Sequence, residues 1–194
     1  MNLTETILGL LRHGQTDWNV ELRLQGTSDI ELNETGIAQA RVAASKIHRS
    51  DWDIILSSPL MRAKVTAEII AEQTGLEVVL VPDLVERSFG EGEGLSHPEW
   101  RKIYESGQQI PGLETVEQLT VRARSLLSLA STHYDGKRIL AVTHGAYIRT
   151  VLRLASDKKY PGANDRLGNV SLSRLMHLDG LWQVIDYNPN SLAS

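Results

Sequence analysis

Two histidines occupy matching places in the sequence, each after a short apolar run and directly before a glycine. His13 follows Ile7–Leu11 and Arg12, and His144 follows Arg138–Thr143. A single histidine in such a place is more often a loop or core residue held by its own hydrogen bonds. Two in the same setting indicate that both stand at one edge of a sheet, where an imidazole can act as a nucleophile or bind an anion.

Charged side chains stand near the ends of other predicted elements. Arg12 adjoins the first histidine, Arg62 falls in the first turn of a helix predicted to begin with a capping Ser58 and Pro59, and Glu86 follows a predicted strand. Taken singly, Arg62 fits a solvated helix residue and Glu86 a surface ion pair. Together, arginines beside a helix N-terminus bind anions, and a carboxyl group can move a proton.

These residues suit the transfer of a phosphoryl group without a metal ion. A neutral His13 can attack phosphorus if its other ring nitrogen donates a hydrogen bond. Arg12, Arg62 and a protonated His144 can hold the charge on the equatorial oxygens. Glu86 can protonate the leaving alkoxide and then activate the water that releases phosphate.

The elements that must position these residues alternate along the chain. Strands are predicted at 7–11, 53–57, 77–81 and 138–143, with helices at 33–48, from 58, at 115–134 and at 146–154. Val170–Tyr187 predicts a hairpin around Asp179-Gly180. The alternation predicts an α/β fold with a mainly parallel sheet, helices on both faces and ligands at the carboxyl ends of the strands.

One segment, Gly90–Leu113, fits neither a helical nor a strand period, and we expect a small, irregular, lid-like insertion there. Its apolar residues Trp100, Ile103 and Tyr104 either line the site or belong to an amphipathic helix that packs on the body. With 194 residues and no Pro/Gly/Ser-rich linker, the whole chain, 1–194, is expected to form a single domain.

Composition excludes several classes of protein. The net charge of −4 offers no basic excess for nucleic acid or an anionic membrane, and the absence of cysteine excludes disulfides and thiolate sites. Met1–Leu11 lacks the features of a signal peptide, and no run approaches membrane-spanning length. We therefore expect a cytoplasmic protein whose partners are small phosphorylated metabolites. Its oligomeric state cannot be read from the sequence.

The motifs around these residues resemble the signature sequences of the histidine phosphatase superfamily. The resemblance spans nearly the whole chain with every motif in family order, which makes the set far more specific than the short Arg-His-Gly sequence alone. It implies the phosphoglycerate-mutase-like fold, a three-layer α/β/α sandwich with a mainly parallel mixed sheet. The motifs are Arg12-His13-Gly14-Gln15-Thr16-Asp17-Trp18-Asn19, Leu24-Gln25-Gly26, Leu32-Asn33-Glu34-Thr35-Gly36, Ser57-Ser58-Pro59-Leu60-Met61-Arg62-Ala63, Glu86 with Phe89-Gly90, and Thr143-His144-Gly145.

The resemblance implies a role for each matched residue and no cofactor. His13 is implied to carry the phosphoryl group as phosphohistidine, and Glu86 to be the proton donor and acceptor. The residues implied to bind phosphate or substrate are Arg12, Asn19, Gln25, Gly26, Arg62, His144 and Gly145.

Within the family, the chain resembles most the short bacterial broad-specificity phosphatases. Mutases typically carry a longer insertion with adjacent arginines, whereas the span from Glu86 to Glu114 is short and its only comparable pair is Arg101-Lys102. Acidic residues in that span are expected to repel a highly anionic ligand; they are Glu91, Glu93, Glu99 and Glu105.

Other functions were weighed against this one. A phosphoglycerate mutase and an α-ribazole phosphate phosphatase are alternatives within the family. A phosphate-recognition module without turnover is disfavoured because neither His13 nor Glu86 is lost. A metallohydrolase is disfavoured because the sequence has neither HExxH nor CxxC spacing and places arginines beside the histidines.

Overall fold

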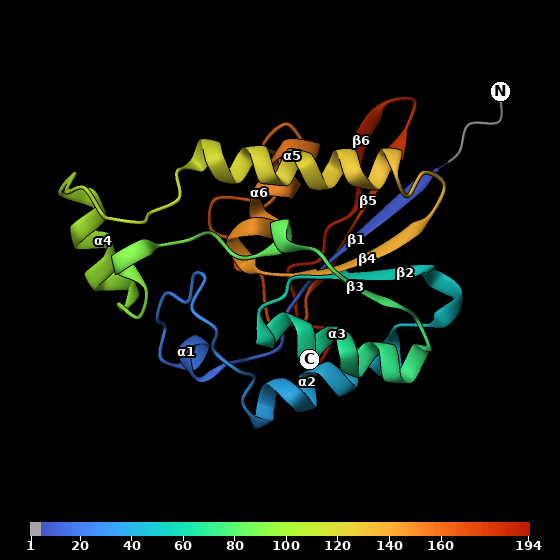
Figure 1. Cartoon of the computed structure of the whole chain (residues 1–194), viewed down its shortest axis with the longest axis horizontal. Coiled ribbons are helices and arrows are strands. Elements are labelled where there is room, and N and C mark those ends of the chain that lie inside the picture. The colour runs from blue at the N-terminus through green and yellow to red at the C-terminus, as the bar shows by residue number, and fades with distance from the viewer. Residues whose placement is uncertain (1–4) are drawn as a thin grey trace.

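A six-stranded mixed sheet runs through the centre of the protein, whose computed structural model describes residues 5–194 (Figure 1). The strand order is β3-β2-β4-β1-β5-β6. The first four strands in this order are parallel, and β5 and β6 form the antiparallel hairpin at one side. The predicted mainly parallel sheet is therefore confirmed. The strands are β1 (Thr6–Arg12), β2 (Ile54–Ser57), β3 (Val78–Leu80), β4 (Arg138–Thr143), β5 (Leu172–Leu178) and β6 (Leu181–Asp186).

Helices cover both faces of this sheet and complete the predicted three layers (Figure 1). One apolar cluster, with Leu126 and Val151, joins the sheet to two helices, and a second, with Ala67 and Ile70, joins it to two others. None of the helices within residues 5–194 is long and apolar enough to cross a membrane. The first pair is α5 (Val116–Thr132) and α6 (Gly145–Ala155), and the second pair is α2 (Glu34–Lys46) and α3 (Met61–Thr74).

Side-chain caps fix where two of these helices begin. Asn33 accepts a hydrogen bond from the N–H of Gly36 at the start of α2. Thr115 and Gln118 form the predicted capping box at the start of α5. Such caps satisfy backbone donors that a helix leaves free in its first turn.

The predicted cap of α3 is wrong. The helix begins at Met61, its N-cap is Leu60, and the side chain of Asp29, rather than that of Ser58, accepts from the N–H of Met61 at 2.7 Å. Ser58 lies outside the helix, and its hydroxyl makes a 2.8 Å hydrogen bond with Nε2 of His144. Arg62 nevertheless stands in the first turn, as predicted.

Segment 90–113 is more regular than the sequence suggests, because it contains a short 3-10 turn at Gly90–Gly92 and the helix α4 (His97–Glu105). Ser96 and Glu99 form a capping box at the start of α4. The ring of Trp100 lies edge-on to Phe89, with centroids 5.4 Å apart. Helix α1 (Asp17–Val20), near α4 in Figure 1, was not predicted.

The remaining described elements are short. They are η1 (Arg49–Asp51), η2 (Pro82–Leu84) and η3 (Gly90–Gly92). The first four residues of the Met1–Leu11 segment lie outside the described part of the chain.

The strand order decides where the two histidines meet. β1 and β4 are neighbours, and their register pairs Arg12 with Thr143. His13 and His144 are the next residues of the two strands, so they leave the sheet side by side with ring centroids 5.2 Å apart.

Candidate active site

A cavity of about 390 Å³ opens at the carboxyl ends of β1 and β4. Eight of the nine site residues expected from the sequence line it. His144 does not, although its ring lies against that of His13. The eight are Arg12, His13, Asn19, Gln25, Gly26, Arg62, Glu86 and Gly145.

The imidazole of His13 is held in one tautomer. Its Nδ1 lies 2.6 Å from the carbonyl oxygen of Gly14, which can only accept, so Nδ1 carries the proton. Burial lowers the pKa of His13 well below its ordinary value, and the charges of Arg62 and Arg12 lower it further. The ring is therefore neutral near pH 7, with a lone pair on Nε2. Within residues 5–194 no group forms a hydrogen bond with that atom.

Arg62 is completely buried, and its guanidinium has a fixed orientation. It donates to the carbonyl oxygens of Ser28 (2.8 Å) and Gly26 (2.7 Å) and, through Nε, to Nδ1 of His144 (3.2 Å). Burial lowers the pKa of Arg62 to about 10, so the side chain stays charged at neutral pH. A fixed cation therefore lies in the cavity before any ligand binds.

The structure corrects the expected protonated His144. Its Nδ1 accepts from Arg62, so Nδ1 has no proton, and Nε2 donates to the Ser58 hydroxyl. Burial lowers the pKa of His144 well below the ordinary value, and Arg62 lowers it further. In this state His144 is neutral and holds Arg62, and the fixed positive charge next to His13 comes from the arginines.

Arg12 contributes a second cation, which is partly buried. One terminal nitrogen donates to the carbonyl oxygen of Leu167, whereas the buried Nε has no partner within residues 5–194. A methyl group added to Gly145 would stand 3.6 Å from this Nε and 3.9 Å from a carboxylate oxygen of Glu86. Arg12 and Glu86 thus approach the same point of the cavity, where a free donor faces any bound anion.

The carboxylate of Glu86 sits on the N-terminus of α6. Its Oε2 accepts from the N–H of Ala146 and its Oε1 from that of Tyr147, each at 3.0 Å, and Oε1 also accepts from Arg87 at 2.9 Å. A carboxylate has about four acceptor directions. Three amide donors orient it and leave one direction, on Oε2, for a substrate.

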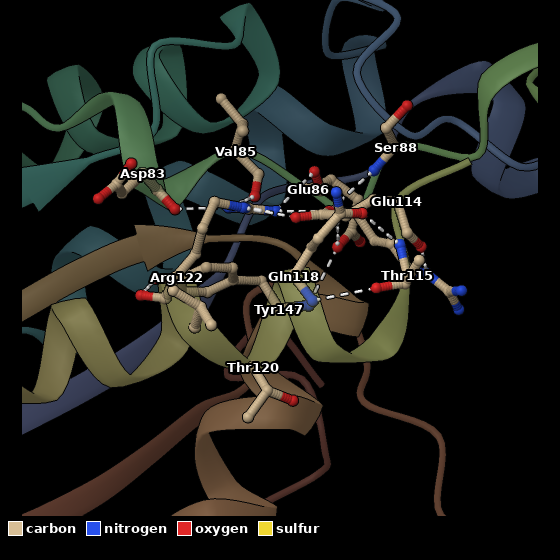
Figure 2. A network of polar contacts seen from close by, with 12 residues as sticks. Asp83, Val85, Glu86, Ser88, Glu114, Thr115, Gln118, Thr120, Arg122 and Tyr147 are labelled. Atoms are coloured by element: carbon tan, nitrogen blue, oxygen red, sulfur yellow. Dashed lines mark hydrogen bonds and ion pairs between the residues drawn. The ribbon is translucent and has the colours of Figure 1, made fainter. Parts of the chain in front are cut away.

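A network behind Glu86 was not predicted (Figure 2). Arg122 of α5 donates to both carboxylate oxygens of Glu114, at 2.7 and 2.8 Å. It also donates to the carbonyl oxygens of Asp83, Val85 and Glu86. All five of its donors are thereby used. The sequence predicts only that Arg122 lies on a helix, and the hydrogen bonds of the folded chain show that it reaches the backbone at Glu86.

Two amides at the cavity wall complete the surroundings of His13. Asn169, also missed from the sequence, donates to the carbonyl oxygen of His13 (3.0 Å) and to the side-chain oxygen of Asn19 (3.2 Å). This leaves the amide nitrogen of Asn19 free to donate. The buried side-chain oxygen of Gln25 has no partner within residues 5–194, so it can accept from a ligand.

The charge expected around the site is wrong in sign. Glu93 is occupied by the backbone and hydroxyl groups of Thr27 and Ser28, and Glu99 by the cap of α4. Neither of them lines the cavity, and neither does Glu91 or Glu105. Basic side chains stand there in addition to Arg12 and Arg62, namely Arg23, His97, Arg149 and Arg166. The expected repulsion of anionic ligands therefore fails.

Trp100, Ile103 and Tyr104 do not line this cavity either. Trp100 packs against Tyr104 and against Phe89, which directly precedes segment 90–113 and lines the cavity. The three residues belong to the helix α4, as the second alternative expected, but none of them joins the apolar clusters of the body.

The site combines a neutral imidazole that has a free nitrogen, two arginines and an oriented carboxylate at the edge of the sheet of a three-layer α/β fold. This combination is typical of phosphoryl-transfer enzymes. Comparison with known proteins identifies the family. A sequence model of the histidine phosphatase superfamily (branch 1) matches residues 8–190. The chain is 41% identical over 186 residues to an uncharacterized phosphatase, PhoE, of Bacillus subtilis, and the match covers 96% of each chain.

Two further matches extend this result. A probable phosphoglycerate mutase, GpmB, of Photorhabdus laumondii is 36% identical over 187 residues, with 89% of this chain and 86% of that protein covered. The crystal structure of a phosphoserine phosphatase from Entamoeba histolytica in complex with 3-phosphoglyceric acid superposes with a TM-score of 0.83 at 32% identity, covering 97% of this chain and 100% of that one. The chain belongs to the histidine phosphatase superfamily and is a phosphomonoester hydrolase.

Proposed function

We propose that this phosphatase hydrolyses small phosphomonoesters through a phosphohistidine at His13, without a metal ion. The observation that carries the proposal is the 2.6 Å hydrogen bond from Nδ1 of His13 to the carbonyl oxygen of Gly14. It leaves the lone pair of Nε2 available as the nucleophile, beside the buried Arg62 and the partly buried Arg12, which can hold a phosphate.

In the first step, Nε2 of His13 forms a bond to phosphorus while the ester P–O bond breaks. The bonding electrons leave on the alcohol oxygen, which takes a proton from the carboxyl group of Glu86. The equatorial oxygens carry the charge, and Arg12 and Arg62 lie where they can stabilise it. The free amide nitrogen of Asn19 and the backbone at Gly26 and Gly145 complete the phosphate site.

In the second step, the carboxylate of Glu86 takes a proton from a water molecule. The water oxygen bonds to phosphorus, the P–N bond breaks, and its electrons return to Nε2 of His13. Inorganic phosphate leaves, and the carboxyl group and the imidazole are restored to their first states. His144 acts indirectly, because it accepts from Arg62 and fixes that guanidinium.

The test is to trap the intermediate. Rapid mixing with a ³²P-labelled ester and quenching in base should leave base-stable, acid-labile label that mass spectrometry assigns to His13. His13→Asn should remove both label and turnover while the circular dichroism spectrum stays that of the native protein. Full activity in His13→Asn would refute the mechanism.

The mutase alternative rests on relatives such as the GpmB protein. A mutase transfers the phosphoryl group to a second hydroxyl, so 3-phosphoglycerate should give 2-phosphoglycerate. A phosphatase gives glycerate and phosphate. A coupled assay for 2-phosphoglycerate beside one for phosphate separates the two, and we expect phosphate release to dominate. Phosphate release from α-ribazole phosphate in the same panel tests the other family alternative.

We also propose that the enzyme works in the cytoplasm and as one domain in which segment 90–113 covers the site. The cytoplasmic location is supported by the substrate class, because membranes retain charged phosphomonoesters inside the cell. Cell fractionation tests this proposal. The second is supported by His97, the residue of segment 90–113 that lines the cavity. If segment 90–113 covers the site, a bound substrate should slow the amide exchange of that segment.

A further inference from the structure

Positive charge is concentrated in the cavity although the chain as a whole carries −4. Five arginines line it against a single carboxylate, Glu86. Arg12 and Arg62 suffice to balance the two charges of a phosphate group. The other three, Arg23, Arg149 and Arg166, lie outside the residues of the family motifs and are not used in the proposed transfer of the phosphoryl group.

These three arginines differ in whether their charge is already balanced. Arg23 forms an ion pair with Glu21 and donates to the carbonyl oxygen of Gly94. Within residues 5–194, Arg149 and Arg166 form no ion pair. Two cations in the cavity therefore lack a counter-charge.

The two unpaired arginines stand on elements that also build the phosphate site. Arg149 lies one turn along α6 from Gly145, and one of its nitrogens donates to the carbonyl oxygen of Asp165 at 2.6 Å. Arg166 directly precedes Leu167, whose carbonyl oxygen holds Arg12. A single ligand in the cavity can therefore touch the phosphate site and these arginines together.

Arg149 contacts the backbone of Asp165 but forms no ion pair with its carboxylate. The side chain of Asp165 accepts from the hydroxyl of Tyr187 (2.8 Å) and from the N–H of Gly162 (2.8 Å). Arg166 and His97, the first residue of α4, both line the cavity. Burial of His97 lowers its pKa, and the positive charge of Arg166 lowers it further. Neither arginine has an acidic partner within residues 5–194, and both line the cavity.

We propose that Arg149 and Arg166 form a subsite for a carboxylate on the alcohol part of the substrate, so that the preferred substrates are phosphomonoesters of small hydroxy acids. The inference rests on the proposed function and extends it. The guanidinium fork matches the geometry of a carboxylate. With Arg23 paired and Arg12 and Arg62 balancing a phosphate dianion, Arg149 and Arg166 are the cavity cations that remain for an anionic group on the alcohol part.

The test compares pairs of esters that differ in one carboxylate. Phosphoserine is paired with phosphoethanolamine, and 3-phosphoglycerate with glycerol 3-phosphate. Arg149→Met and Arg166→Met remove the proposed subsite, and Arg153→Met is the matched control, because it removes the same charge from the exposed last turn of α6 outside the cavity. The measurement is kcat/KM for each ester with each protein.

We expect the wild-type enzyme to prefer each carboxylated ester by about tenfold or more, since one charge-assisted hydrogen bond is worth at least ~1.4 kcal/mol. In each cavity variant, kcat/KM should fall by about that factor for the carboxylated ester and by less than about twofold for the ester without the carboxylate. In the control, kcat/KM for both esters should change only by the small effect of a surface charge. Retained turnover of phosphoethanolamine shows that a variant is folded and that its phosphate site works.

Three results would overturn the proposal. Equal kcat/KM for both members of each pair in the wild type would show that no carboxylate is recognised. Parallel losses on both members would place Arg149 and Arg166 in the phosphate site or the fold instead. A bisphosphorylated ester preferred over the carboxylated one would assign the subsite to a second phosphate. Failure of the wild type to hydrolyse any of the four esters would instead refute the proposed function.

Discussion

Replacing Arg122 with methionine tests whether the network in Figure 2 positions the general acid. Methionine keeps an apolar stem over the ring of Tyr147, on which the guanidinium now lies 5.2 Å from the centroid. It removes all five donors, so Glu114 loses its partner. The carbonyl oxygens of Val85 and Glu86 lose the donors that fix the backbone on both sides of the Glu86 side chain.

The expected loss of stability follows from burial. The side chains of Arg122 and Glu114 are 19% and 13% exposed. Removing one partner of a buried ion pair typically costs ~3–5 kcal/mol, and this partial exposure favours the lower end, about 3 kcal/mol. A domain with an unfolding free energy of about 5–15 kcal/mol remains folded after such a loss. The variant is thus suited to kinetic measurement.

The kinetic effect should depend on the leaving group. If Glu86 moves, protonation of the alcohol oxygen suffers, and a misplacement of about 1 Å can cost on the order of 10²-fold. We expect a loss of about 10–100-fold in kcat/KM for an alkyl ester, part of the ~10²–10⁴-fold that an acid supplies. For p-nitrophenyl phosphate the loss should be small, because the phenolate leaves without a proton.

The assay measures kcat/KM for both esters and the urea midpoint of unfolding. Arg138→Met is the control, since it breaks the ion pair with Asp53 at the opposite end of β4, where the side chains are 43% and 33% exposed. That control should lose some stability and keep the wild-type ratio of the two esters. If Arg122→Met keeps the same ratio too, the network serves the fold alone and does not position Glu86.

Three other predictions test the charge and protonation of the site. The pKa values of His13 and His144 in the folded protein lie below the value of about 6.5 for the unfolded chain, so below that pH the unfolded state binds more protons. The free energy of unfolding should therefore decrease as the pH falls, with a slope that approaches ~2.7 kcal/mol per pH unit for the two groups. Urea unfolding between pH 7 and 5 should show a smaller slope in His13→Asn than in the wild type, and an exposed control, His48→Asn, should keep the full slope; equal slopes in all three would contradict the assigned neutral imidazole. Arg62→Lys keeps a positive charge but loses the guanidinium that donates to Gly26, Ser28 and His144. It should reduce kcat/KM by about 10²-fold, the effect of one lost transition-state donor. Unchanged kinetics would show that charge alone is sufficient. Activity should survive EDTA and be inhibited by vanadate, whereas loss on chelation and recovery with a divalent ion would favour the metallohydrolase.

Local patterns in the sequence predict the elements well but not how they pair. Strand and helix periods, the capping box at Thr115 and the Asp179-Gly180 turn each depend on near neighbours, and each is found where expected. Serine followed by proline also looked like a helix start. The hydroxyl of Ser58 instead forms a hydrogen bond with His144, which is far away in the chain. No local sequence pattern reveals such a contact.

The glycine of the Arg-His-Gly motif shows the same limit. A glycine directly after a strand-end histidine is typical of a backbone with positive φ or of a close approach by a ligand. Instead, a methyl group there would stand 2.5 Å from the carbonyl oxygen of Gly36, and one on Gly36 would stand 2.0 Å from that of Gln15. The two motif glycines let the loop after β1 lie against the start of α2. Both were noted in the sequence, but only the packing explains them.

The position of Glu86 links these observations to the reaction. In many α/β proteins a helix N-terminus binds the phosphate of the ligand, yet here the N–H groups of Ala146 and Tyr147 in the first turn of α6 are taken by an internal carboxylate. The proposed phosphate site therefore relies mainly on Arg12 and Arg62, whose orientation is set by backbone carbonyl oxygens and by His144. In the proposed reaction a negative charge appears on Glu86 when it gives up its proton, and the donors that receive this charge are already in place. The same donors hold the carboxylate toward the cavity when the water molecule arrives, so one helix end can serve both halves of the proton cycle without moving.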